Sequence, residues 1–178
     1  VTTLFFGATQ QYTGTWGATG SGAQHIDDSR FSGSGVLNVT SGPSPAGYST
    51  WAATNAPGQT ANQDYDNDGI SNGVEFVLGG LATTNDASKL PTLATTGGNL
   101  IFTFVRDQNS KTADTSVKID VGTTLAAWPA SFTVGNTTAT SSPGVTVTDN
   151  GNGTDTVTLT VSQAPDSRKF ARLEVTIH

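Results

Sequence analysis

Cysteine and methionine are both absent from this chain of 178 residues, and charged side chains are scarce. Without cysteine no disulfide can stabilise the fold, so packing or a bound metal must do so. Only 12% of the residues are charged, and the net charge is −6. The few basic residues are scattered, which disfavours nucleic-acid binding because phosphate recognition needs clustered Lys and Arg. No stretch approaches the roughly 20 apolar residues of a membrane-spanning helix.

Small and β-branched residues dominate what the chain does contain. Glycine alone accounts for 21 residues, and threonine, serine and valine recur throughout. This composition favours short strands joined by many turns over long helices. We therefore predict a mainly β fold centred on an antiparallel β-sandwich, either jelly-roll or immunoglobulin-like. The expected units are an N-terminal β segment (1–43), a linker with a short helix–calcium loop–helix insert (44–89) and the sandwich (90–178).

The sandwich is predicted from alternating apolar and polar residues after residue 90. Leu100, Phe102 and Phe104 fall on one face of a strand, and later valines alternate with threonines, as expected where one face is solvated. The turns recur at the roughly 8–12-residue spacing of a sandwich. The expected strands cover residues 99–106, 115–121, 131–134, 144–148, 155–161 and 170–177.

Residues 64–75 carry the strongest functional signal. Three aspartates alternate over five positions, Gly69 follows at once, and a glutamate occupies the twelfth place. This is the spacing of an EF-hand calcium loop, in which alternating acids point at a common centre and the glycine allows a sharp bend. Such close carboxylates repel one another unless a cation lies among them. The expected Ca²⁺ ligands are the side chains of Asp64, Asp66, Asp68, Asn72 (directly or through water) and Glu75, and the backbone carbonyl of Ile70.

The simpler alternative is an acidic turn that leads into a short helix. Asn72 would then be the N-cap residue and Glu75 would close a capping box. This alternative accounts for Asn72 and Glu75 but leaves the three alternating aspartates and Gly69 to chance.

Helical patterns flank the loop. Apolar residues at i, i+3, i+4 spacing predict a helix over 48–55, which Pro57 and Gly58 end. A second helix follows the loop and is expected to stop at Gly79 and Gly80. Gly73 within it costs about 1 kcal/mol in helix propensity, which metal ligation by Glu75 would offset. The apolar face of this second helix would comprise Ile70, Val74, Val77 and Leu78. The two prolines within residues 42–47 predict a linker before these helices.

The N-terminal segment is predicted to form strands over 3–6, 10–16 and 31–40, the last most clearly over 36–40. Its first residues are short, apolar and strand-prone, so they are candidates to add to the sheet edge of another copy and give fibres. Pairing within the same chain is the alternative. The candidate assembly strand consists of Val1, Thr2, Thr3, Leu4, Phe5 and Phe6.

Two stretches of this segment resemble a known family. The runs 11–17 (QYTGTWG) and 26–37 (IDDSRFSGSGVL) look like the end of an autotransporter-associated β-strand repeat, which builds β-helical regions of bacterial surface proteins. One copy is found, whereas a solenoid needs about three repeats to bury a core. The segment is therefore expected to pack on the rest of the chain or on a neighbour.

The remainder resembles the C-terminal module of large secreted proteins from Verrucomicrobia and Planctomycetes. The resemblance implies an extracellular location, calcium at the loop and a β-sandwich, and it brings no known catalytic activity. It rests on the order of Trp51, the loop 64–75, the runs 76–79, 90–91 and 102–104, the stretch from Leu125 to Trp128, and the run 170–173.

Other candidate sites have weaker support. Tyr12 and Trp16, or Trp128, would suit a sugar-stacking platform, although such aromatics are more often part of a core. Residues 149–155 are acidic and glycine-rich, but their Asn-Gly pairs favour a hairpin turn over a second cation site. His25 and His178 are far apart in the sequence and lack catalytic partners.

The sequence thus predicts a non-enzymatic, calcium-stabilised structural module of a bacterial cell surface or matrix, with self-assembly by strand addition. Calcium would clamp the helix–loop–helix joint and hold the N-terminal strands in a fixed relation to the sandwich. The alternative is a carbohydrate-binding or adhesive domain that uses exposed aromatic residues.

Overall fold

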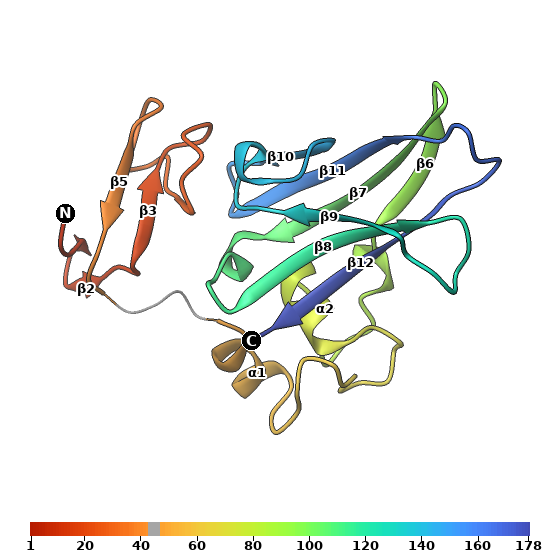
Figure 1. The fold of residues 1–178 in the computed structure, drawn as a ribbon. Helices are drawn as coiled ribbons and strands as arrows, with labels where there is room; N and C mark the ends of the chain where they lie inside the picture. Colours follow the sequence, from red (N-terminus) through yellow and green to blue (C-terminus); the bar gives the residue numbers. More distant parts are fainter. Residues whose placement is uncertain (43–46) are drawn as a thin grey trace.

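The computed structural model describes residues 1–42 and 47–178. It contains a small N-terminal β unit, drawn in red and orange in Figure 1, beside a larger β-sandwich that carries two helices. The predicted antiparallel β-sandwich with a short helix–loop–helix insert is therefore confirmed. The linker predicted over 42–47 falls mainly on residues 43–46, which lie outside the described residues.

The sandwich consists of a four-stranded and a three-stranded sheet, both antiparallel throughout. Three hairpins alternate between the sheets along the chain, and the last strand returns to pair with β8. The first sheet has the order β10 (Val145–Asp149), β11 (Thr154–Ser162), β7 (Asn99–Asp107), β6 (Thr92–Thr96), and the second has the order β12 (Phe170–Ile177), β8 (Thr115–Gly122), β9 (Ala130–Val134). Short 3₁₀ turns cover Ala87–Lys89, Gln108–Ser110 and Thr138–Thr140.

The two sheets enclose one core between their inner faces. The predicted alternation in β7 is observed, since Phe102 and Phe104 are buried while Val105 is 46% exposed. Phe104 lies next to Val157 of β11 in the sheet. Ile119 of β8, also fully buried, contributes to the same core from the opposite sheet.

Both predicted helices pack on this core. Helix α1 (Tyr48–Asn55) has the predicted bounds, and α2 (Asn72–Leu78) begins after Ile70 and ends at Gly79, which has a positive φ of 67°. Tyr48 of α1 and Phe76 of α2 are buried in the sandwich core and their rings meet edge-on, with centroids 5.9 Å apart. Because α2 also packs against β7 and β12, the helices belong to the sandwich unit.

The N-terminal unit is built on a three-stranded sheet with the order β4-β3-β5. Strand β3 (Gly14–Gly17) pairs with antiparallel β5 (Val36–Val39) and with the two-residue parallel strand β4 (His25–Ile26). A separate hairpin joins β1 (Phe5–Phe6) to β2 (Thr9–Gln10). The predicted strand over 10–16 was wrong as one element, because Gly14 has a positive φ of 121° and the chain leaves the extended conformation between β2 and β3.

Two strands were not predicted. Strand β6 is the edge of its sheet and all five of its residues are exposed, so its sequence lacks the alternation that marks a half-buried strand. Strand β4 has two residues, too few for any periodicity to appear.

Candidate metal centre

The loop after α1 is shaped by its own aspartates. The two carboxylate oxygens of Asp64 accept the backbone N–H groups of Asn67 and Gly69, each at 2.8 Å. In the same way, Asp68 Oδ1 accepts the N–H of Ile70 at 2.8 Å. Asn67 and Gly69 have positive φ values of 62° and 91°, which asparagine and glycine tolerate best. The chain therefore wraps around the aspartates.

This wrapping brings three carboxylates together. Oxygen atoms of Asp64, Asp66 and Asp68 all lie within 4.8 Å of one another, and all three side chains are half-buried. Such a group could hold a metal ion, since carboxylate oxygens are the ligands of hard cations.

Glu75 is the most unusual residue of the site. It is only 1% exposed, and neither carboxylate oxygen has a hydrogen-bond partner among the described residues. In the part of the chain that the structure describes, Asp66 Oδ2 is also buried without a hydrogen-bond partner. Burial, followed by the charges of Asp66 and Asp68, raises the pKa of Glu75 from 4.5 to about 7. A buried carboxylate without a donor is costly, so a bound cation among these oxygens fits the residues present.

The capping-box alternative does not fit the structure. The N-cap of α2 is Ser71 rather than Asn72, and within 1–42 and 47–178 no backbone N–H donates to the Glu75 carboxylate. The backbone N–H of Asn72 instead donates to the carbonyl of Gln63 at 2.8 Å.

Asn72 holds the loop in place through its side-chain amide, and its role as a metal ligand stays a prediction. Its side chain is fully buried, and its Oδ1 accepts the backbone N–H of Tyr65 at 3.0 Å. Its Nδ2 donates to the carbonyl of Thr60 at 3.0 Å and to Gln59 Oε1 at 3.2 Å. Through these bonds Asn72 fixes the loop against the residues that follow α1.

Asp86 was missed by the sequence prediction. Its backbone N–H donates to Asp68 Oδ2 at 2.9 Å, and its charge is a further cause of the raised pKa of Glu75. Asp86 lies beyond the twelve-residue loop in an irregular segment after α2, where no spacing rule applies. The sequence feature that could have indicated it is an acidic residue in the short segment after Gly79 and Gly80.

No family model, curated protein or solved structure matches this chain. Its function is therefore argued from the site itself. Over residues 1–42 and 47–178, no helix combines the length and the apolar character needed to cross a membrane.

The proposed sugar platform is not assembled by the fold. Trp16 is 7% exposed and packs edge-on against Phe6 at 5.2 Å, so its ring cannot stack on a sugar, and this part of the prediction was wrong. Tyr12 is 39% exposed but has the His25 ring beside it at 6.0 Å. Trp128 is half-buried in the sandwich unit, where the Arg172 guanidinium lies over its ring at 4.9 Å.

The candidate assembly strand is paired within its own chain. The N–H₃⁺ group of Val1 donates to the carbonyl of Asn38, and the carbonyls of Val1 and Thr2 accept from Thr40 and Ser41. Strand β1 pairs with β2 in addition. Strand addition to another copy stays a prediction, and a second copy would have to displace these bonds.

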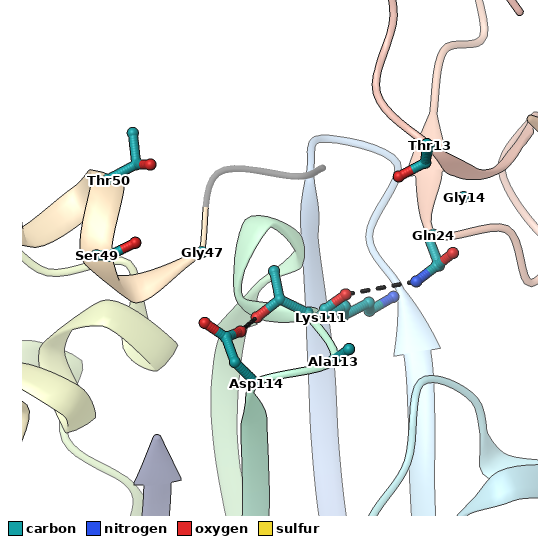
Figure 2. Close-up of a pocket in the computed structure, with 10 residues that line it drawn as sticks. Thr13, Gly14, Gln24, Gly47, Ser49, Thr50, Lys111, Ala113 and Asp114 are labelled. Carbon is teal, nitrogen blue, oxygen red and sulfur yellow. Dashed lines mark hydrogen bonds between the residues drawn. The ribbon is translucent and has the colours of Figure 1, made fainter. Parts of the chain in front are cut away.

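A polar cavity of about 530 Å³ lies between the N-terminal sheet, the start of α1 and the chain before β8 (Figure 2). Within it, Gln24 Nε2 donates to the backbone carbonyl of Lys111 at 3.4 Å, a direct tie between the two β units. The Lys111 amine is engaged by Asp155 and the Asp114 carboxylate by Thr112. Both charged side chains that line the cavity are thus engaged by groups of the same chain.

Residues 149–155 form the predicted hairpin turn between β10 and β11. Asp155 is 1% exposed and is bonded by Arg106 at 2.7 Å and Lys111 at 2.8 Å, both buried themselves. Burial lowers the pKa of both cations, and the charge of Asp155 opposes that shift. This carboxylate belongs to a structural ion cluster rather than to a second cation site.

The two histidines lie in separate places. The His25 ring stacks beside Trp16 with centroids 4.6 Å apart, and His178 Nε2 contacts Ser116 Oγ at 2.9 Å. Burial lowers the pKa of His25.

Proposed function

We propose that the loop binds calcium through Asp64, Asp66, Asp68 and Glu75, with the Ile70 carbonyl as a further ligand. The observation that carries this proposal is the buried Glu75 carboxylate, whose two oxygens have no partner among the described residues beside three converging aspartates. A divalent cation would supply the missing interaction for Glu75 and remove the repulsion among the four carboxylates.

Calcium suits this ligand set better than magnesium. Calcium takes six to eight oxygen ligands in a flexible geometry, whereas magnesium retains waters and is bound by one or two carboxylates. Four carboxylates and a carbonyl on a loop that wraps around its centre favour calcium. The absence of cysteine and the all-oxygen donor set give softer metals no preferred ligand.

The role that we propose for the cation is structural. Glu75 lies on α2 directly before Phe76, Val77 and Leu78, which are all buried in the sandwich core. A cation held by the loop and by Glu75 would fasten the loop to this helix and hence to the core. Among the described residues, the loop aspartates and Glu75 form no hydrogen bond or ion pair with the N-terminal unit, which is tied to the sandwich by Gln24 and Lys111. We therefore place the clamp at the edge of the sandwich, not between the two β units.

A non-enzymatic module of a bacterial surface or extracellular matrix is the setting that we propose. Extracellular calcium modules are typically saturated at roughly 10⁻⁴–10⁻³ M, a range that suits a permanent clamp. The lack of disulfides adds to the need for a metal in a secreted chain. The resemblance to C-terminal modules of secreted proteins supports the same setting.

Thermal melts in calcium and in excess chelator test the clamp. At a calcium concentration of 100 times Kd, binding to the folded state stabilises it by about 2.7 kcal/mol, so the melting temperature rises. The Glu75→Gln variant should lose this rise. In chelator, however, it should melt above the parent, because it no longer buries an unpaired carboxylate.

Asp166→Asn is the matched control, since Asp166 lies in the turn between β11 and β12 and pairs only loosely with Lys169 at 3.3 Å. This variant should keep the full response to calcium. Equal melting temperatures of the parent in calcium and in chelator would refute the calcium clamp.

A further inference from the structure

The segment that follows α2 turns back along the metal loop. Helix α2 ends at Gly79, which has a positive φ of 67°, and the N–H of Leu81 then donates to Asp86 Oδ2 at 2.6 Å. The N–H of Asp86 donates to Asp68 Oδ2 at 2.9 Å. Asp86 is thus joined to one loop aspartate, and its half-buried carboxylate is held in place by the segment's own backbone.

Gly80 shows how close Asp86 and Glu75 are. A Cβ atom placed on Gly80 would lie 2.8 Å from Asp86 Oδ2 and 3.2 Å from Glu75 Cβ. Any side chain at this position would therefore enter the space between the two acidic residues. The glycine allows Asp86 to approach the buried glutamate directly.

Asp86 adds a fifth carboxylate to those of the three loop aspartates and Glu75. Without a cation, a fifth carboxylate beside a buried and unpartnered one is repulsive.

We propose that Asp86 is a further ligand of the cation bound at the loop, so that cation binding also fastens residues 80–89 onto α2. This inference rests on the proposed calcium site. The ion then joins three separate parts of the chain: the loop, α2 through Glu75, and the connection that leads into edge strand β6. Calcium would accordingly control the order of that connection as well as that of the loop.

Calorimetric titration of calcium into the parent, Asp86→Asn and the control Asp166→Asn tests this ligand. Asparagine keeps an oxygen that can accept the Leu81 N–H but removes the charge. We expect roughly 10-fold weaker binding or more for Asp86→Asn, because affinity follows the charge of the ligand set. The control should bind as the parent does. Parent-like affinity in Asp86→Asn would overturn the assignment of Asp86 while leaving the calcium loop intact, whereas a parent that binds no calcium would overturn both.

Hydrogen exchange of the parent protein gives a readout that does not depend on a variant's folding. Calcium should slow exchange at residues 81–89 as well as at the loop. In Asp86→Asn, calcium should still slow exchange at the loop but no longer at residues 81–89. Protection confined to the loop and α2 at saturating calcium would overturn the proposal.

Discussion

Glu75 and Phe76 are neighbours in α2, but their side chains lie in opposite environments. Phe76 is 3% exposed and packs in the sandwich core, with the Tyr48 and Trp51 ring centroids 5.9 and 5.7 Å away. Glu75 is equally buried, but its surroundings include the charges of the loop aspartates, and neither of its carboxylate oxygens has a hydrogen-bond partner among the described residues. One short helix thus links the acidic site to the hydrophobic core. Calcium binding or protonation at the site should therefore change the free energy of unfolding of the sandwich.

The stability of the cation-free protein should depend on pH in a sense opposite to that of most carboxylates. The pKa of Glu75 is about 7 in the folded chain against 4.5 when exposed, and burial shifts the pKa of Asp66 in the same direction. The contribution of Glu75 to the free energy of unfolding is complete below pH 4.5 and is lost as the pH rises through about 7. In urea denaturation with chelator, the contribution of Glu75 to the free energy of unfolding should therefore be larger at pH 5.5 than at pH 7.5.

Calcium and Glu75→Gln serve as controls for this titration. Calcium binds the ionised carboxylate, so its affinity should fall as the pH drops below about 7. The difference between parent and Glu75→Gln stability in chelator isolates this one group. If the free energy of unfolding depends on pH in the same way in the parent and in Glu75→Gln, the raised pKa of Glu75 is contradicted.

Gly73→Ala should destabilise the protein even though alanine favours helices by about 1 kcal/mol. A Cβ atom at position 73 would lie 3.0 Å from Ala61 Cβ and 3.1 Å from the Ala61 carbonyl oxygen, which accepts the Gly73 N–H. Overpacking of this kind typically costs about 1–3 kcal/mol. Urea denaturation of the parent and of Gly73→Ala measures the change.

Ala61→Gly removes the Cβ atom that an alanine at position 73 would meet, so it is the matched background in which to repeat Gly73→Ala. The loss caused by Gly73→Ala should be smaller when Ala61 is already glycine. An alanine at 73 that raises the free energy of unfolding would show that helix propensity, not the approach of residue 61, governs this position.

Asp155→Ala should be among the most destabilising substitutions in the chain. It would leave Arg106 and Lys111 buried without their shared carboxylate, and removing one partner of a buried ion cluster costs about 3–5 kcal/mol. The half-exposed Asp166→Asn should change the free energy of unfolding by less than about 1 kcal/mol. Chemical denaturation at pH 7.5 compares the two, and similar losses would contradict a structural role for the cluster.

The N-terminal unit should lose stability on acidification through His25. Burial beside Trp16 lowers the pKa of His25 below 6.5, so the folded state resists the proton that the unfolded state accepts. The stability contributed by neutral His25 is complete above pH 6.5 and is lost as the pH falls further. Proton NMR of the imidazole should give a pKa below 6.5, and a value at or above 6.5 would disprove the shift.

The sequence predicted the parts of the fold in which local pattern determines structure. The helix over Tyr48–Asn55 and the alternation of Phe102 and Phe104 with exposed neighbours follow from periodicity alone, and both are observed. The spacing of the three aspartates also predicts their convergence, because each accepts backbone N–H groups of the same turn.

The rest depends on contacts between distant parts of the chain. Asp86 reaches the site only because the chain reverses at Gly79 and Gly80. Trp16 is buried because Phe6 and Phe31 surround it, which no strand pattern reveals. Asn72 bonds to Tyr65 and to the residues after α1, tertiary contacts that the spacing rule does not reveal.

A calorimetric titration of calcium into the parent and into Glu75→Gln at pH 7.5 tests the central claim most directly. The account predicts saturable binding of one calcium ion per chain to the parent and a loss of affinity of roughly 10-fold or more in Glu75→Gln. Magnesium should bind more weakly than calcium in the same experiment. Identical isotherms for parent and variant, or no calcium binding by the parent, would contradict the account.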